Sequence, residues 1–145
     1  MRAVIQRVNE ASVWVDGKRI SSIKRGIVIL LGIEKKDTPK ELVKMVDRCL
    51  NLRIFEDEEG KMNYSVLEKH YDVLVVPNFT VASHIKKGRR PSFDNAMPPE
   101  KAMHMFTQFV KTIWEMGVDV SSGQFGAHMH VALVNDGPVT FIIEV

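Results

Sequence analysis

The sequence has little of several features that narrow down function when they are abundant. One cysteine, Cys49, occurs among 145 residues, which excludes an internal disulfide framework and favours a reducing compartment. No apolar run approaches the roughly 18 residues of a membrane-spanning helix, and the first residues do not resemble a signal peptide, so we expect a cytoplasmic protein without membrane contact. The net charge of +2 at pH 7 is too small to indicate nucleic-acid binding by itself.

Familiar catalytic and metal-binding motifs are also missing. There is no G-x-S-x-G elbow, P-loop, G-x-G-x-x-G or C-x-x-C pattern. The acidic run at 56–59 lacks the alternating ligand spacing of an EF-hand, so a solvated turn is expected. His128 and His130 share one face of a predicted strand, but no third ligand follows at a recognisable spacing. We therefore expect neither a metal nor another cofactor, and Cys49 is expected to be an inert core residue.

Hydrophobic patterns predict one α+β domain over residues 1–145. Strands are expected at 3–8, 12–15, 18–23, 26–32, 53–55, 71–76, 118–121, 128–134 and 139–143. The run 26–32 is continuously apolar, which is typical of a strand buried on both faces. Asp16-Gly17 predicts a hairpin turn. Because several strands are linked by hairpins, mostly antiparallel or mixed, barrel-like sheets are expected.

Two amphipathic helices complete the predicted fold. The first begins at a capping box, in which Thr38 is followed by Pro39 and, three positions after the cap, by Glu41. The second spans residues 99–116 and ends at Gly117. Each has one apolar stripe, so both main helices are expected to pack on one side of the sheets.

Positive charge is concentrated in one irregular stretch, residues 80–99. Lys86, Lys87, Arg89 and Arg90 are four cations within five positions. A run of charge usually belongs to a solvated face. A loop that contains Gly and Pro is also suited to following a phosphate backbone, so these four residues are candidate tRNA contacts.

The segment 135–140, NDGPVT, allows two interpretations. Asx-Gly-Pro clusters are turn signals, so a plain turn between two strands is one of them. The other is a cis peptide at Gly137-Pro138, which costs an X-Pro bond only about 0.5–1 kcal/mol. Such a bond would point two neighbouring carbonyl oxygens the same way and make a wall of backbone.

Together with the blocks named below, these residues make the chain resemble the D-aminoacyl-tRNA deacylase family over essentially its whole length. The matching blocks stand in the family's order: MRAVIQRV (1–8), ASV (11–13), LGI (31–33), LRIFED (52–57), GKMN (60–63), KGRRPSF (87–93), FGAHM (125–129) and NDGPVT (135–140). The resemblance implies a cytoplasmic homodimer that hydrolyses the ester between a D-amino acid and the 3′-terminal adenosine of aminoacyl-tRNA. Gly137 and Pro138 would form a cis pair inserted into the partner subunit's active site. Their carbonyl oxygens would exclude an L side chain, while D-amino acids and glycine would pass.

The resemblance also implies that the catalytic centre consists largely of backbone. N–H groups of the block Asn78-Phe79-Thr80 would hold the oxyanion while water attacks the ester. The 2′-hydroxyl of the terminal ribose would assist that attack. The Thr80 hydroxyl is either a nucleophile or a positioning group, and no adjacent general base is evident. The family usually has Ser-Gln where this chain has Pro77-Asn78. Pro77 therefore removes a hydroxyl and one backbone N–H. The property that this change concerns is how strictly the enzyme rejects L-amino acids.

Five further residues match positions that contact substrate or support the Gly-Pro segment. Phe125 and Met129 would line the pocket, with core packing as the alternative. Arg7, on the first strand, would hold the Gly-Pro segment, with a solvated arginine as the alternative. Asn135 and Thr140 flank that segment and complete the set of expected substrate-binding residues.

Two other functions fit the same residues. The first is a non-catalytic tRNA-binding dimer that keeps the basic loop and has lost turnover through the change at Pro77. The second is a hydrolase of small D-amino-acid esters that does not act on tRNA.

Overall fold

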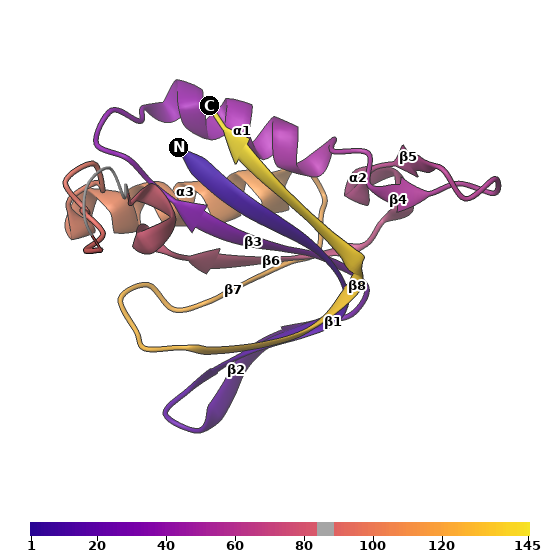
Figure 1. Ribbon diagram of the computed structural model, residues 1–145, viewed down its shortest axis with the longest axis horizontal. Helices are drawn as coiled ribbons and strands as arrows, with labels where there is room; N and C mark the ends of the chain where they lie inside the picture. The colour runs from indigo at the N-terminus through magenta and orange to yellow at the C-terminus, as the bar shows by residue number, and fades with distance from the viewer. Residues whose placement is uncertain (84–88) are drawn as a thin grey trace.

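The computed structural model describes residues 1–83 and 89–145 (Figure 1). Its main sheet has six strands: β1 (Arg2–Val15), β2 (Lys18–Ile23), β3 (Gly26–Gly32), β6 (Asp72–Pro77), β7 (Val120–Ser122) and β8 (His130–Glu144). The strand order is β2-β1-β3-β6-β7, and β8 pairs with β1. The β3–β6 and β6–β7 pairs are parallel and the others are antiparallel, so the sheet is mixed, as predicted.

The sheet curls until it is nearly a barrel. The first half of β1 pairs with β3 and its second half with β2, and β8 follows β1 along most of its length. Both β1 and β8 bend sharply where this change of partner occurs (Figure 1). On the opposite side, Ser121 Oγ donates to Ser22 O at 3.5 Å and links β7 to β2. The barrel-like sheet predicted from the sequence is confirmed.

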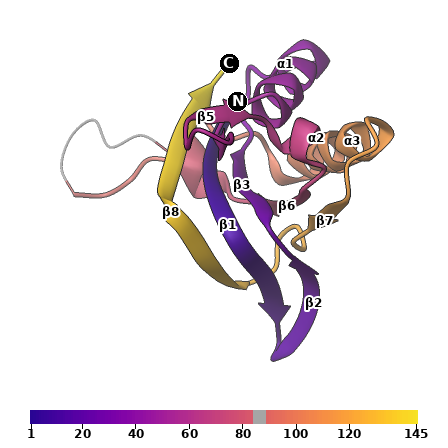
Figure 2. The same cartoon turned by 90° about the vertical axis from the view of Figure 1, so that its right-hand side faces the viewer.

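Two long helices cover one face of the sheet, also as predicted (Figure 2). They are α1 (Pro39–Leu50) and α3 (Pro99–Glu115). The capping box at the start of α1 is present, because Lys40 N donates to Thr38 Oγ1 and Thr38 N donates to Glu41 Oε2. The short elements are β4 (Phe55–Glu56), β5 (Met62–Tyr64), α2 (Val66–Lys69) and the 3-10 helix η1 (Phe79–Ala82).

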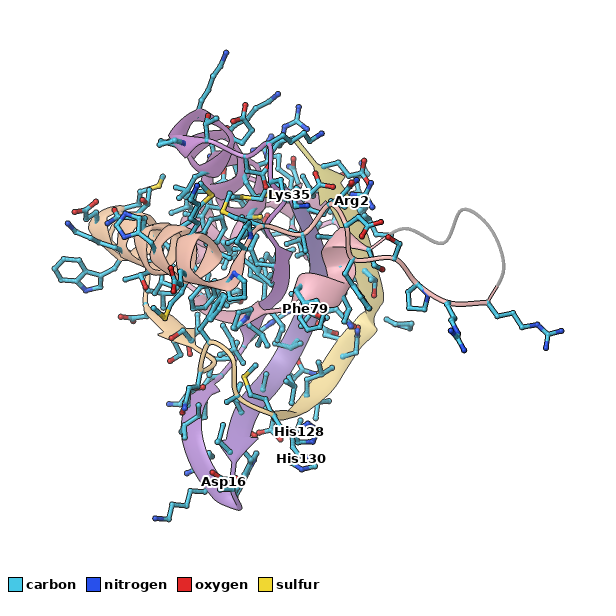
Figure 3. The ribbon with its side chains drawn as sticks, turned by 90° about the vertical axis from the view of Figure 1, so that its left-hand side faces the viewer. Arg2, Asp16, Lys35, Phe79, His128 and His130 are labelled. Carbon is cyan, nitrogen blue, oxygen red and sulfur yellow. The ribbon has the colours of Figure 1, made fainter. Side chains whose placement is uncertain are left out.

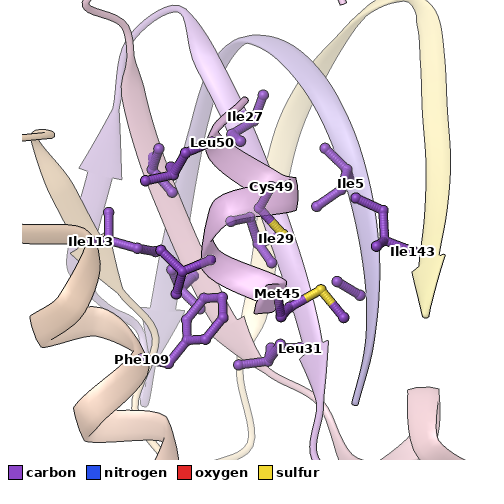
Figure 4. Close-up of a cluster of buried hydrophobic side chains, with 14 of the residues drawn as sticks. Ile5, Ile27, Ile29, Leu31, Met45, Cys49, Leu50, Phe109, Ile113 and Ile143 are labelled. Atoms are coloured by element: carbon purple, nitrogen blue, oxygen red, sulfur yellow. The ribbon is translucent and has the colours of Figure 1, made fainter. Parts of the chain in front are cut away.

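Both faces of the central strands are buried. On β3, Ile27, Ile29 and Leu31 face the helices, whereas Val28 faces the inside of the barrel, as the predicted doubly buried strand requires. The helix-side core includes Ile5, Ile27, Ile29, Leu31, Met45, Cys49, Leu50, Phe109, Ile113 and Ile143 (Figure 4). The barrel-side core consists of Val8, Ala11, Val13, Ile23, Val28, Leu74 and Val76.

Two predictions of separate strands are wrong. Residues 3–8 and 12–15 belong to the single strand β1, which continues through a bulge at Asn9 because Val8 pairs with Asn135 and Glu10 with Val134. Residues 128–134 and 139–143 were likewise expected as two strands, but β8 runs unbroken through them from His130. The interpretation of residues 135–140 as a plain turn between two strands is therefore also wrong. No helix of the described residues is long and apolar enough to cross a membrane.

Candidate functional site

A largely apolar cavity of about 530 Å³ opens beside the ends of β3 and β6. It is lined by Leu31, Ile33, Lys35, Pro77, Asn78, Phe79, Phe93, Ala96, Met97, Pro98, Pro99, Ala102, Phe125 and Gly126. Gly32 allows η1 to pack closely over the end of β3, since an added Cβ would lie 2.8 Å from Ala82 N. The parallel strands thus deliver their C-terminal ends, and the loop after them, to one site.

The backbone at the end of β6 leaves one donor unpaired. Asn78 N donates to Leu31 O at 2.8 Å, and the Asn78 side chain caps η1 by accepting from Thr80 N at 3.2 Å. Among the residues that the structure describes, nothing accepts a hydrogen bond from Phe79 N–H. That group is therefore available to a ligand in the cavity that Phe79 lines.

The Thr80 hydroxyl is already engaged. Thr80 Oγ1 donates to Asn78 Oδ1 at 2.5 Å, and Thr80 is not among the residues that line the cavity. No carboxylate or imidazole of the described chain accepts a hydrogen bond from it. Its geometry suits a residue that orients Asn78 better than it suits an activated nucleophile.

Three phenylalanines are among the residues that line the cavity, and one of them, Phe79, is labelled in Figure 3. Phe125 is half-buried, and its ring centroid lies 6.0 Å from that of the buried Phe106, so it forms an inner wall backed by the core. Phe79 and Phe93 are exposed and contact each other edge to face, with centroids 5.1 Å apart. The sequence pointed to Phe79 and Phe125. Phe93 was missed, although it ends one of the matching blocks.

The Gly137-Pro138 peptide is cis and lies in a large bulge of β8. Gln6 pairs with Thr140 and Val8 with Asn135, so four residues of β8 stand opposite Arg7 alone. Asn135 fastens the bulge, because its side chain donates to Gln6 Oε1 and accepts from Val139 N. The cavity lining does not include Gly137 or Pro138, so within one chain the two sites are separate.

Arg7 supports the bulge from beneath. It is only 4% exposed, which rules out the solvated-arginine alternative. Arg7 Nη1 donates to Ile54 O at 2.6 Å, and Nε donates to Asp136 O at 3.1 Å and faces Asp136 Oδ2 at 3.2 Å. Buried guanidinium groups require such partners, so Arg7 ties the bulge to the loop that precedes β4.

Met129 and the basic residues lie elsewhere. Met129 packs against the barrel-side core beside Pro77, since both side chains would contact a Cβ added to Gly123, and it does not line the cavity. Arg89 and Arg90 are exposed. Lys86 and Lys87 lie outside the described residues. Among the described residues the cation that does line the cavity is Lys35, which the sequence analysis missed because it belongs to none of the patterns or matching blocks.

The remaining candidate groups do not form a second reactive centre. Cys49 is buried in the helix-side core, and burial raises the pKa of its thiol to about 12. His128 and His130 have ring centroids 5.4 Å apart (Figure 3), and both are exposed. Across residues 1–83 and 89–145, no group of three or more His, Cys, Asp or Glu side chains is arranged to hold a metal ion.

Known proteins resemble this chain along its whole length. The family model described as D-Tyr-tRNA(Tyr) deacylase matches residues 4–144. Proteins named D-aminoacyl-tRNA deacylase from Geotalea daltonii and Aquifex aeolicus are 54% and 51% identical over 144 residues, covering 99% of this chain and 96% and 97% of theirs.

Two solved structures share the fold. A c-Myc DNA unwinding element binding protein matches with a TM-score of 0.95 at 46% identity, over 100% of this chain and 99% of that one. A chain described as "a probable eukaryotic D-amino acid tRNA deacylase" matches with a TM-score of 0.78 at 21% identity, over 99% and 98% of the two chains. The family match and the identities of the relatives together show that the chain belongs to the D-Tyr-tRNA(Tyr) deacylase family.

Proposed function

We propose that this protein is a D-aminoacyl-tRNA deacylase, which hydrolyses the ester between a D-amino acid and the 3′-terminal adenosine of tRNA. The relatives at about half identity carry that name. The observation that carries the proposal is the Phe79 N–H, which has no acceptor among the described residues, beside an apolar cavity. A donor of this kind stabilises the oxyanion that forms when water attacks an ester.

The reaction needs little from side chains. Water adds to the ester carbonyl, the oxygen gains negative charge, and Phe79 N–H donates to it. The tetrahedral intermediate then collapses: the bond between the carbonyl carbon and the 3′-oxygen breaks, the proton given up by the attacking water passes to that oxygen, and the amino acid and the 3′-hydroxyl of the ribose are released. Lys35 and Asn78 are the polar side chains of the described lining, and no carboxylate or imidazole is among them. As the resemblance to the deacylase family implies, the adjacent 2′-hydroxyl of the substrate assists the attacking water.

Chirality is set by the Gly137-Pro138 bulge of a second copy. The bulge is remote from the cavity of its own chain, and Arg7 and Asn135 hold it in one geometry. In the described chain β8 pairs with β1 alone, and Val134, Phe141 and Ile142 are exposed along it, which favours a second copy against this strand. Backbone oxygens of the inserted bulge would then exclude an L side chain while glycine passes.

A deacylation assay with one tRNA charged with D-tyrosine, L-tyrosine or glycine tests the proposal. We expect rapid loss of the D-tyrosyl and glycyl esters and persistence of the L-tyrosyl ester. Binding of charged tRNA without turnover would instead support a non-catalytic tRNA-binding dimer. Equal hydrolysis of free D-tyrosine ethyl ester would support a small-ester hydrolase.

The role of a second copy is tested separately. Light scattering across a dilution series gives the mass of the particle, and activity is measured in the same samples. We expect a particle of two chains and loss of activity together with dissociation. A fully active single chain would refute insertion of the bulge into a partner's cavity.

A further inference from the structure

Phe79 and Phe93 form an exposed aromatic rim on the cavity. Phe79 is 61% exposed and Phe93 is 40% exposed, and both line the cavity. Their ring planes meet at 63°. Single exposed aromatic residues are ordinary in proteins. Two that contact each other at the margin of a cavity offer a surface on which another flat ring can stack.

The chain holds Phe93 in place before any ligand arrives. Ala96 N donates to Phe93 O at 2.9 Å, and Ser92 Oγ donates to Asp94 Oδ2 at 2.7 Å, which closes a tight turn around Phe93. This turn is attached to the segment after β3, because Lys35 N donates to Asn95 O at 2.9 Å. A surface fixed in advance loses little conformational entropy when it binds a ring.

Positive charge lies on the cavity lining and in the segment that leads to the rim. Lys35 lines the same cavity (Figure 3), and none of the described carboxylates forms an ion pair with its ammonium group. The neighbouring Lys36, in contrast, faces Glu34 at 3.7 Å. Arg89 and Arg90 are exposed in the segment that leads to Phe93. An aromatic surface that shares a cavity with a cation is suited to binding single-stranded nucleic acid.

The cavity therefore offers two places for a flat ring. The inner one is the wall made by Phe125 against the core, and the outer one is the rim. In single-stranded RNA a phosphate joins each pair of neighbouring nucleosides, and among the described residues Lys35 is the cation of the cavity lining. This set of groups, two ring sites and one cation on the described lining of a single cavity, fits two consecutive nucleotides.

We propose that the rim of Phe79 and Phe93 stacks the nucleobase that precedes the terminal adenosine of tRNA, and that Lys35 neutralises the phosphate between them. The proposal rests on the deacylase function above, which supplies the RNA 3′ end as the ligand. Stacking is sequence-tolerant, so the rim recognises the presence of a base and not its identity. Its role is to add affinity beyond what the aminoacylated nucleoside alone provides.

The test compares two model substrates that differ by one nucleotide. One is the D-tyrosyl ester of adenosine, and the other is the D-tyrosyl ester of the dinucleotide CpA. The measured quantity is the ratio of their kcat/KM values. We expect the dinucleotide to be the better substrate of the unaltered protein, and Phe93→Leu to lower the ratio about ten-fold through KM, which is the size of one base-stacking contact. Phe93→Tyr keeps a stacking ring and is expected to preserve the ratio.

A matched control and a second measurement keep the result independent of folding. Trp114, at the end of α3, is 68% exposed and does not line the cavity, so Trp114→Leu should leave the ratio unchanged. With the unaltered protein, a dinucleotide ester that lacks the 5′ base should behave like Phe93→Leu with CpA. An unchanged ratio in Phe93→Leu, or full activity on the abasic ester, would overturn the proposal.

The contribution of Lys35 is measured by its dependence on salt. Lys35→Met should flatten the dependence of KM on salt for the CpA ester, whereas Lys44→Met, an exposed lysine of α1, should not. If the unaltered protein hydrolyses neither ester, the proposed deacylase function fails. The proposed stacking at the rim is then tested by the Kd of uncharged CpA, which Phe93→Leu should raise about ten-fold. An unchanged Kd would refute the stacking proposal.

Discussion

The cavity and the Gly137-Pro138 bulge use opposite means to place backbone atoms. The cavity presents the Phe79 N–H through backbone hydrogen bonds, such as Asn78 N to Leu31 O, and its lining is mostly apolar. The bulge presents backbone held by a buried charged side chain, Arg7. The comparison teaches that most side-chain substitutions at the cavity leave its donor in place, whereas one substitution beneath the bulge removes its support.

The largest effect is expected from removing the cavity donor. Phe79→Pro deletes the N–H, and the extended conformation of Asn78, with φ −145° and ψ 92°, is compatible with a following proline. We expect kcat for D-tyrosyl-tRNA to fall about 10²–10³-fold, as when an oxyanion donor is lost. Phe79→Leu keeps the N–H and should lose far less in kcat. A Phe79→Pro enzyme with more than a tenth of the original kcat would exclude this N–H from the oxyanion site.

The next effect concerns the support of the bulge. Arg7→Met removes the donor to Ile54 O and the nearer of the two arginines that face Asp136, and it should lower the free energy of unfolding by about 2–3 kcal/mol. Urea unfolding measures this loss, and the ratio of D- to L-tyrosyl-tRNA hydrolysis should fall with it. Arg25 is half-exposed and also faces Asp136, at 3.8 Å, so Arg25→Met should cost less than about 1 kcal/mol. Equal losses in the two variants would contradict a special role for Arg7.

A smaller loss of stability is expected from crowding the bulge itself. Gly137 has a φ of +133°, and an added Cβ would lie 2.6 Å from Val139 Cγ2 and 2.8 Å from Val139 N. Gly137→Ala should therefore destabilise the protein by about 1–3 kcal/mol and reduce D-over-L selectivity. Gly60→Ala is the control, since Gly60 also has a positive φ but open space around it. Selectivity that survives Gly137→Ala would argue against a filter made from this backbone.

The smallest effect on kcat is expected from removing the Thr80 hydroxyl, and it tests whether catalysis at the cavity relies on backbone groups. Thr80→Val removes a hydroxyl that donates to Asn78 Oδ1, and we expect kcat to fall less than about ten-fold. Loss of a true nucleophile costs on the order of 10⁶-fold in kcat. Thr80→Ser retains the hydroxyl and should match the unaltered enzyme. A collapse of kcat in Thr80→Val alone would restore the nucleophile hypothesis.

Local structure was the most predictable part of this chain. The capping box at Thr38 and Glu41 and the hairpin at Asp16-Gly17 follow from short-range chemistry, and both are present. The strands 3–8 and 12–15 were separated wrongly because a bulge at Asn9 shifts the alternation of inward and outward residues. A pattern with a period of two cannot reveal a strand that continues through such a shift.

The site was predictable in part for a related reason. Matching blocks pointed to Phe79, Phe125 and Gly137-Pro138, but not to Lys35 or Phe93. These two meet the cavity only because residues 33–35 bind the segment around Asn95 and Ala96. A contact between two segments so far apart in the sequence leaves no periodic signal in either of them.

The sequence by itself determined the family, through its matching blocks. It also determined the class of fold and the local elements, because caps, turns and apolar periodicity act over a few residues. The tertiary structure alone decided that Arg7 is buried and contacts Asp136, 129 positions away. It also decided that four residues of β8 bulge opposite Arg7, that Phe79 N–H stays unpaired in the described chain, and that the cavity and the bulge lie apart. These features depend on the register of long-range strand pairs, which is set by packing of the whole sheet.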